Sequence, residues 1–305
     1  MSGSGILVVG SIALDTIRTP AGSRVSALGG SASYFALAAS RYVPVRVVAV
    51  VGDDFQQSHR DTLSRERIDT SGIQVADGKT FRWEGVYSED MNERTTIATE
   101  LNVFDQFHPV LPEGYRNSKA VFLANIDPLL QEEVLDQLSD PWLVALDTMN
   151  YWISNRPADL LRVLRRVHIF LVNDAEARQL TGADNILKAA EGIRMMGPSI
   201  VVIKRGEYGA LTRTERGWFQ MPAYPVEALK DPTGAGDTFA GGMLGRLALE
   251  GNLDEKAVRR GIAHGTAIAS FAVEEFGVEG LTRVREGELH ARVRALHEMT
   301  RFDPE

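Results

Sequence analysis

Cysteine is absent from the 305 residues of this chain. Its absence excludes disulfide bonds, thiolate nucleophiles and zinc sites built from cysteine, and it does not favour one cellular compartment over another. The 6 histidines show none of the paired spacings that are typical of metal ligands. We therefore assign the histidines no chemical role.

Basic clusters and long apolar runs are also absent. The formal charge is −8 and the isoelectric point is near 5.4, and no basic patch would attract nucleic acid or an anionic membrane. The segment from Met1 to Gly5 lacks the charged start of a signal peptide, and the apolar run after it is too short to span a membrane. We expect a cytoplasmic protein whose partner is a small molecule, with no nucleic acid and no membrane partner.

Two common nucleotide-binding motifs do not occur. The chain has no Gly-x-x-x-x-Gly-Lys-Ser/Thr loop and no Gly-x-Gly-x-x-Gly fingerprint. An NAD-type oxidoreductase could still use Gly29 and Gly30 as its phosphate loop, but the missing third glycine argues against that alternative.

The stretch from Asp231 to Gly242 is the most informative part of the sequence. Its small residues predict a tight loop that opens into an apolar helix, with Phe239 and Met243 on one face. The unpaired N–H groups at such a helix start form an anion site, and Gly234 and Gly236 allow a phosphate to approach the main chain. The alternative is an ordinary helix start that is capped by the side chain of Thr233 or Asp237.

Asp237 favours the functional interpretation of this stretch. Its carboxylate lies inside the predicted anion site, where bound phosphate would repel it unless it takes up a proton. Gly241 and Gly242 follow one helical turn later and leave a patch without side chains, at a cost of about 1 kcal/mol per glycine relative to alanine.

Short apolar runs alternate with helical patterns along most of the chain. Such runs occur at 6–9, 45–51, 121–124, 143–146, 169–172 and 200–203. This order predicts one α/β domain over residues 1–305, with a doubly wound, mostly parallel sheet flanked by helices. Ligands of such sheets bind beyond the carboxyl ends of the strands. The polar residues expected there are Asp15, Asn125, Asp127, Asp147, Asn150, Asn173, Glu176 and the segment 204–209.

Asn173 and Glu176 allow two interpretations. Three residues apart at a helix start, they would face the same way and could hold a hydrated Mg²⁺. The same spacing is also right for a capping box, in which the two residues satisfy the main chain of the first helical turn.

Residues 73–100 differ from the rest of the chain in their pattern. Polar and apolar residues alternate around Trp83 and Tyr87, which predicts strands outside the main sheet. A peripheral hairpin with one face on the core would show the same alternation. We expect the preceding segment, 54–67, to form an exposed helix.

These residues resemble the ribokinase-like, PfkB-type carbohydrate and nucleoside kinases. The stretch from Asp231 to Leu244 fits the C-terminal signature of that family at every defined position, and the resemblance covers most of the chain. It implies that Asp237 is the base that deprotonates the acceptor hydroxyl. It also implies that the amides of Gly234, Ala235, Gly236 and Asp237 hold the transferring phosphoryl group.

The resemblance implies further site residues. Asp15, the Gly29–Gly30 main chain, Tyr34, Trp83, Asn125 and Asn150 would bind the acceptor, under a small β-sheet lid built from about 14–20 and 74–100. ATP would contact Asn173, Lys204, Gly206, Gly209, Gly234 and Gly236, with Mg²⁺ held through water by Glu176. A monovalent cation, K⁺, would bind at Asp231, and the lid could form a homodimer.

The expected activity is ATP-dependent phosphorylation of a hydroxymethyl group on a sugar or nucleoside. Tyr34 replaces the asparagine that usually contacts the sugar in this family, and Trp83, Tyr151 and Trp152 add flat apolar faces, which favours a nucleoside because a nucleobase can stack on them. The alternatives are a kinase for a free sugar such as ribose or fructose, and a non-catalytic sugar or nucleotide sensor. A sensor would be marked by loss of the base, and Asp237 is present.

Overall fold

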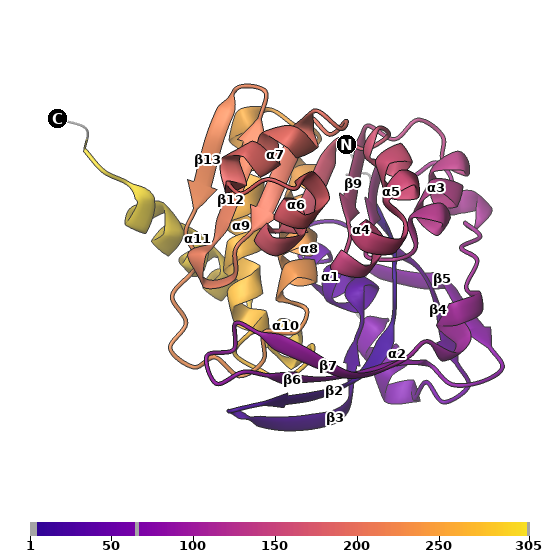
Figure 1. Ribbon diagram of the computed structural model, residues 1–305. Helices are drawn as coiled ribbons and strands as arrows, with labels where there is room; N and C mark the ends of the chain where they lie inside the picture. The colour runs from indigo at the N-terminus through magenta and orange to yellow at the C-terminus, as the bar shows by residue number, and fades with distance from the viewer. Residues whose placement is uncertain (1–4, 65–66, 304–305) are drawn as a thin grey trace.

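A nine-stranded sheet forms the centre of the molecule in the computed structural model, which describes residues 5–64 and 67–303 (Figure 1). Its strand order is β13-β12-β11-β10-β9-β8-β1-β4-β5. All neighbours pair in parallel except β11–β12 and β12–β13. The strands are β1 (Ile6–Val9), β4 (Val45–Gly52), β5 (Ile68–Ala76), β8 (Ala120–Leu123), β9 (Leu143–Asp147), β10 (Ile169–Asn173), β11 (Ile200–Lys204), β12 (Ala210–Thr214) and β13 (Gly217–Met221).

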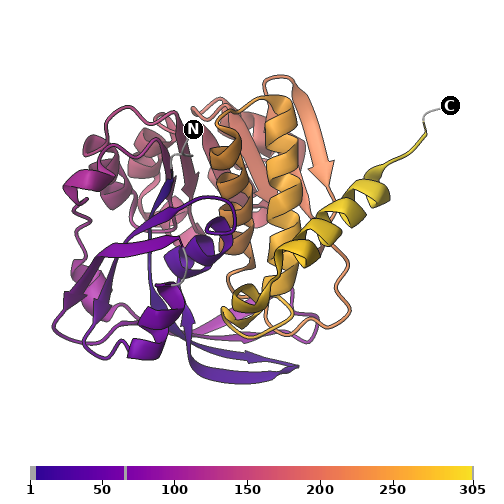
Figure 2. The same ribbon diagram turned by 180° about the vertical axis from the view of Figure 1, so that it is seen from behind.

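Helices cover both faces of this sheet, as Figures 1 and 2 show from opposite sides. One face carries α1 (Ser31–Ala39), α8 (Ala235–Glu250) and α9 (Glu255–Ala272), with α2 (Gln57–Leu63), α10 (Glu279–Arg283) and α11 (Glu286–Thr300) beside them. The other face carries α3 (Pro128–Asp136), α4 (Asn150–Asn155), α5 (Pro157–Leu164), α6 (Asp174–Thr181) and α7 (Ile186–Arg194). The central strands are apolar runs because both of their faces are buried. The predicted doubly wound α/β fold is confirmed.

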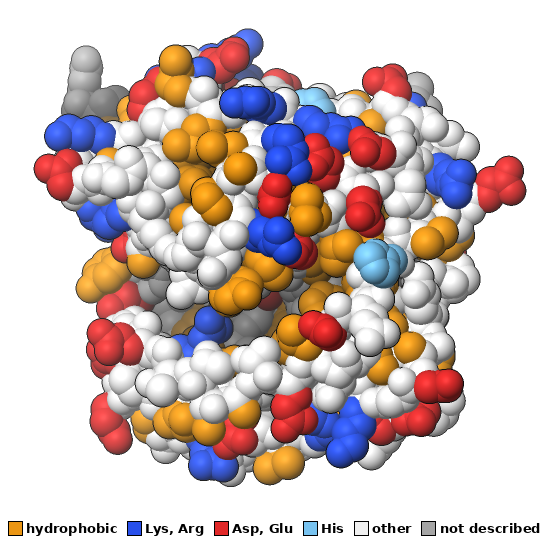
Figure 3. Space-filling view, turned by 45° about the vertical axis from the view of Figure 1, so that its right-hand side comes forward, with side chains coloured by type: hydrophobic (Ala, Val, Ile, Leu, Met, Phe, Trp, Pro, Cys, Tyr) orange, Lys and Arg blue, Asp and Glu red, His pale blue; other side chains and the backbone are white. Residues whose placement is uncertain are grey.

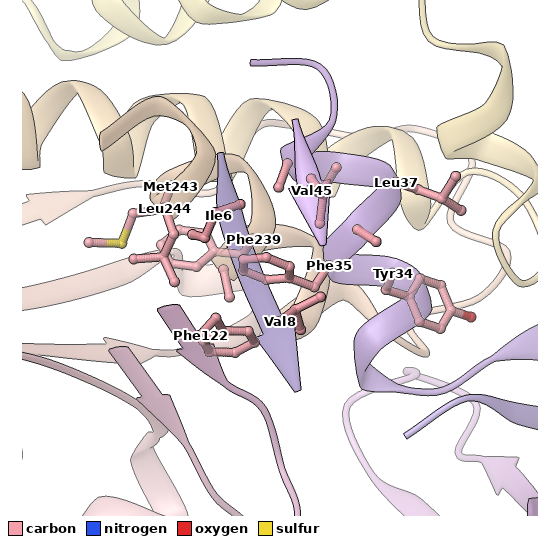
Figure 4. Packing of buried hydrophobic residues seen from close by; sticks show 14 of the residues in the cluster. Ile6, Val8, Tyr34, Phe35, Leu37, Val45, Phe122, Phe239, Met243 and Leu244 are labelled. Atoms are coloured by element: carbon pink, nitrogen blue, oxygen red, sulfur yellow. The ribbon is translucent and has the colours of Figure 1, made fainter. Parts of the chain in front are cut away.

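Packing between α1, α8 and the sheet fixes the start of α8. The rings of Phe35 and Phe122 stack with centroids 4.4 Å apart, and Phe239 and Met243 of α8 pack into the same buried cluster (Figure 4). A Cβ atom at Gly241 would lie 2.5 Å from the carbonyl oxygen of Phe35. The Gly241–Gly242 patch therefore serves close helix packing and not a ligand.

A second, four-stranded sheet lies below the main one in Figure 1. Its order is β3 (Gly22–Gly29), β2 (Ala13–Thr19), β6 (Phe81–Tyr87) and β7 (Arg94–Glu100), and β2 and β6 pair in parallel. We call these four strands the small sheet. The predicted lid boundaries differ from it, because residues 74–76 belong to β5 of the large sheet and β3 was not predicted. As an edge strand β5 alternates buried and exposed residues, and so it resembles a strand of a half-covered hairpin.

The helix predicted over 54–67 is shorter than expected. It begins at Gln57 and ends at Leu63, while residues 65–66, like residues 1–4, lie outside the described part of the chain. The carboxylate of Asp54 accepts hydrogen bonds from the N–H and hydroxyl of Thr80 and pairs with Arg82 at 2.8 Å. These contacts hold Asp54 beside Thr80 and Arg82, outside the helix, so the helix starts after Asp54.

Over residues 5–64 and 67–303, the helices are too short or too polar to cross a lipid bilayer.

Candidate active site

The loop before α8 forms an uncapped helix start. Gly234 is the N-cap residue, and no side chain among the described residues caps the helix. Thr233 and Asp237 therefore do not cap it as the alternative interpretation required. Within the described part of the chain, the N–H groups of Gly234 and Gly236 have no acceptor. Such amides, with the positive end of the helix dipole, favour an anion.

Glycine is required at position 234 for two reasons. Its φ is 73°, in the left-handed region that residues with a Cβ adopt only with strain. A Cβ there would also overlap the ring of Tyr34. At Gly236 the backbone is not left-handed, and a Cβ would lie 3.1 Å from Nζ of Lys204.

Asp237 lies in the first turn of α8 and keeps part of its surface exposed. Burial raises the pKa of its carboxyl to about 7, and the negative charge of Asp147 acts in the same direction, whereas Lys204 and Arg94 lower it. A carboxyl with this pKa can accept a proton near neutral pH and still be ionised for part of the time.

Lys204 and Asp147 form a buried ion pair at the carboxyl ends of β11 and β9. Their Nζ and Oδ2 atoms are 2.6 Å apart. Although burial opposes the charged form, Asp147, Glu176 and Asp237 hold the pKa of Lys204 above its usual value. Lys204 therefore remains a cation beside the anion site. Asp147, which was expected only as one of the polar residues at the strand ends, fixes its position.

Asn173 and Glu176 form the capping box of α6. The side chain of Asn173 accepts from the N–H of Glu176 at 2.8 Å, and that of Glu176 accepts from the N–H of Asn173 at 2.9 Å. Burial raises the pKa of Glu176 to about 7, with a contribution from Asp147. The box occupies one carboxylate oxygen of Glu176, and its role toward Mg²⁺ remains a prediction.

A cavity of about 560 Å³ opens beside the start of α8. Four predicted ATP contacts line it, namely Lys204, Gly206, Gly209 and Gly236, whereas Asn173 and Gly234 are not among its lining residues. The sequence missed the parts of the wall that come from α9, from the segment after β13 and from the turn between β6 and β7, among them Thr266, Ala269, Ser270, Val273, Ala223, Tyr224, Val226, Asp90, Met91 and Asn92. These residues carry no motif and meet only in the folded chain. Figure 3 shows the surface hollowed between the small sheet and the body of the molecule.

Asp15, Gly29, Gly30 and Tyr34 lie together at the junction of the small sheet with α1. A Cβ at Gly29 would overlap the carboxylate of Asp15, so glycine makes room for that side chain. Burial raises the pKa of Asp15 to about 7, and Asp231 adds to the effect. The hydroxyl of Tyr34 is buried and has no hydrogen-bond partner among the described residues, and Figure 4 shows it pointing away from the apolar cluster. It is a free donor beside Asp15 and Asp231.

The small sheet contacts the α8 loop directly. The hydroxyls of Tyr87 and Thr233 are 3.0 Å apart. The ring of Trp83 covers Gly85, donates from Nε1 to Thr96 and carries the guanidinium of Arg94 at 5.1 Å from its centroid. In this structure the contacts of Trp83 thus lie within the small sheet.

Asn125 and Asn150 are placed apart from the group around Asp237. Asn125 accepts a hydrogen bond from Nε1 of Trp152 at 3.0 Å. Asn150 is exposed at the start of α4, where its side chain accepts from the N–H of Tyr151. No contact among the described residues joins either asparagine to Asp237, and their binding of an acceptor remains a prediction.

Asp231 holds two main-chain segments together. Its carboxylate accepts from the N–H groups of Thr233 and Gly277, both at 2.9 Å, and burial raises its pKa. Both oxygens thus have partners within the protein, and a monovalent cation at Asp231 remains a prediction.

The site fits a hydrated Mg²⁺ better than a closed metal site. Residues 5–64 and 67–303 contain no group of three or more metal-binding side chains placed around a common point. Mg²⁺ usually keeps several waters and is held by one or two carboxylates and by substrate phosphates. The free oxygen of Glu176 is a suitable outer ligand for such an ion.

Comparisons with known proteins show which family this chain resembles. The model of the pfkB family carbohydrate kinases matches residues 4–282. A cytidine kinase of Thermococcus kodakarensis is 33% identical over 84% of this chain and 93% of its own length. Among solved structures, a nucleoside kinase of Burkholderia thailandensis in complex with inosine has a TM-score of 0.80, with 23% identity over 95% of this chain and 97% of its own.

An E. coli protein classed as Ribokinase II, in complex with ATP and Mg²⁺, also has a TM-score of 0.80, with 20% identity over 96% of this chain and 99% of its own. The two solved structures share the fold of this chain, and the match to the family model extends over most of its length. The chain belongs to the pfkB family of carbohydrate kinases and is a carbohydrate or nucleoside kinase.

Proposed function

We propose that the protein transfers a phosphoryl group from ATP to a hydroxymethyl group of a nucleoside, with Asp237 as the base. The observation that carries this proposal is the pairing of Asp237, whose pKa burial raises to about 7, with the uncapped start of α8. One helix turn thus offers both a proton acceptor for the hydroxyl and amides for the phosphoryl oxygens.

The donor would occupy the cavity of about 560 Å³. Its apolar wall, with Val226, Ala269 and Val273, suits a flat base, and the Lys204 ammonium lies where phosphates would meet the α8 amides. Glu176 would hold Mg²⁺ through water, and the ion would neutralise charge on the phosphates when bound. The E. coli relative in complex with ATP and Mg²⁺ supports this choice of donor.

In the proposed reaction, the acceptor oxygen attacks the terminal phosphorus in line with the leaving ADP oxygen. Asp237 takes the hydroxyl proton, and the amides from Gly234 to Asp237 stabilise the charge on the transferring group. Lys204 stays protonated beside them because Asp147 pairs with it.

The acceptor would be a nucleoside in preference to a free sugar. The 33% identity with a cytidine kinase over most of both chains supports this choice. Asp15 would accept hydrogen bonds from ribose hydroxyls, and the unpaired hydroxyl of Tyr34 would donate one. A free-sugar kinase is the alternative. A monovalent cation at Asp231, a homodimer through the small sheet and a cytoplasmic location remain predictions.

The test is a kinetic comparison on the purified protein with ATP and Mg²⁺. We expect phosphorylation of the 5′-hydroxyl of at least one of cytidine, uridine, adenosine and inosine, at a kcat/KM well above that for ribose or fructose. A free sugar that exceeds every nucleoside would refute the nucleoside assignment. No turnover with any acceptor, together with no binding of ATP, would refute the kinase assignment of this site.

A further inference from the structure

Arg94, the first residue of β7, is an exposed cation beside the site that the family resemblance did not include. It pairs in register with Tyr87, whose hydroxyl lies 3.0 Å from that of Thr233 in the α8 loop. The small sheet therefore places Arg94 next to the Tyr87–Thr233 contact, through which this sheet touches the α8 loop.

The guanidinium of Arg94 is held by an aromatic ring and not by a carboxylate. It lies 5.1 Å from the centroid of the Trp83 ring, and that ring is fixed by its hydrogen bond to Thr96 and by contact with Gly85. No carboxylate lies within ion-pair distance of Arg94 in the described part of the chain. The guanidinium also donates a hydrogen bond to the hydroxyl of Tyr87, and the other N–H donors of an arginine placed in this way are available for an anion.

The surrounding side chains are rich in negative charge. Asp15, Glu176 and Asp237 come from three different elements, and burial raises the pKa of each to about 7, with Arg94 among the charges that oppose this rise. Lys204, the other cation of this group, is already bonded to Asp147. A phosphoryl donor adds further negative charge, and Arg94, which pairs with no carboxylate among the described residues, can neutralise part of it.

We propose that Arg94 is a catalytic residue supplied by the small sheet, whose guanidinium binds the phosphoryl group during its transfer. The acceptor oxygen forms the new O–P bond while the bond between the terminal phosphorus and the ADP oxygen breaks, and the hydroxyl proton passes to Asp237. Arg94 and the α8 amides both hold the phosphoryl oxygens. Trp83 is a positioning residue for Arg94.

This inference rests on the proposed function, and the first part of its test requires no acceptor. The dissociation constants of Mg-ADP and of Mg-AMP-PNP, which has an additional terminal phosphate, are measured by calorimetry for the wild type and for Arg94→Ala. We expect the variant to bind AMP-PNP about tenfold more weakly relative to ADP, because one charge-assisted contact is lost. With a working acceptor, its kcat should fall by about 10² to 10³, as on loss of one donor to the charge of the transition state.

Two variants sharpen the result. Arg94→Lys keeps the charge without the planar fork and should recover part of kcat. Arg18→Ala removes a cation from the neighbouring strand β2, where Arg18 pairs with Glu84 at 2.8 Å, and should change neither nucleotide affinity nor kcat.

Equal weakening of ADP and AMP-PNP in Arg94→Ala would overturn the proposal, and so would an unchanged kcat with a lower Tm. An effect confined to the KM of the acceptor would also overturn it, since Arg94 would then bind the acceptor. If the nucleoside assignment alone is wrong, the wild type will phosphorylate no nucleoside, but the two nucleotides will still report on Arg94.

Discussion

The large sheet and the small sheet hold their functional residues by different means. Asp147 and Lys204 end buried strands of the large sheet and pair at 2.6 Å, and Asp237 begins a helix whose apolar face is locked into the core. Arg94 and Thr96 belong to β7, which is exposed along most of its length. Packing places the first group, whereas a few polar and aromatic contacts place the second.

This difference indicates that the two sheets have different roles in the site. The large sheet together with α8, the rigid side of the site, can hold the base and the amides within the narrow tolerance that proton and phosphoryl transfer require. The exposed side can open to admit a substrate and still deliver side chains when it closes. Substitutions on the rigid side should therefore affect every acceptor alike, and those on the small sheet should depend on the acceptor or on closure.

The largest effect is expected from Asp237→Asn on the rigid side. The amide keeps the shape but accepts no proton, so kcat should fall by about 10² to 10⁴ for every acceptor while the fold is retained. Steady-state kinetics and a thermal melt measure both quantities. An undiminished kcat would show that Asp237 is not the base.

The pH dependence of the wild type tests the same residue. Because burial and Asp147 raise the pKa of Asp237 to about 7 while Lys204 and Arg94 lower it, kcat should rise with pH through about 7 as the carboxyl loses its proton. Arg94→Ala removes one of the charges that lower this pKa, so the midpoint of its profile should move to higher pH. A profile that is flat from pH 5 to 9 (about two pH units on either side of this pKa) would contradict the assignment.

A smaller loss is expected from Gly234→Ala. The added Cβ would overlap the ring of Tyr34, and the left-handed backbone costs about 1 to 2 kcal/mol. We expect weaker nucleotide binding and a lower Tm. Gly251→Ala is the matched control, since Gly251 ends the same helix with a φ of 70° and nothing lies within 4 Å of its added Cβ. If both variants lose only stability, the loop is not an anion site.

Glu176→Gln should raise the Mg²⁺ concentration needed for half-maximal rate by about tenfold, because an amide holds a hydrated cation less well than a carboxylate. Glu288→Gln is its control, since Glu288 fills the same position of the capping box at the start of α11. Identical small losses of Tm in both variants, with unchanged Mg²⁺ titrations, would leave Glu176 with a capping role only.

Trp83→Ala separates two roles of the small sheet and should give the smallest effect. If the ring positions Arg94, kcat should fall by a few-fold for all acceptors. If instead the ring stacks on a nucleobase, which contributes about 1 to 3 kcal/mol, the KM for nucleosides should rise while that for sugars stays the same. Parallel titrations with one nucleoside and one sugar distinguish these results.

Most of the large sheet and the α8 loop could also be predicted from the sequence. Apolar runs marked β1, β4 and β8 to β11, and the residues from Asp231 to Gly242 marked the α8 loop, because both patterns are local. Arg94 carries no local signal, and its position depends on strand pairing across the small sheet. Strand β3, the membership of β5 in the large sheet and the α9 wall of the donor cavity were missed for the same reason.

The small sheet joins the rest of the molecule at one short edge, so a rotation at that edge moves its far end the most. Strand register brings Ala13, Gly29 and Phe81 together at one short edge, where the chain joins the body of the molecule, while Tyr87 and Arg94 pair at the opposite end. At about 3.3 Å per residue, β6 provides an arm of about 20 Å, so a rotation of about 10° at the hinge edge moves Tyr87 by about 3 to 4 Å. That displacement would separate the hydroxyls of Tyr87 and Thr233, and it would carry Arg94 away from the α8 loop together with Tyr87.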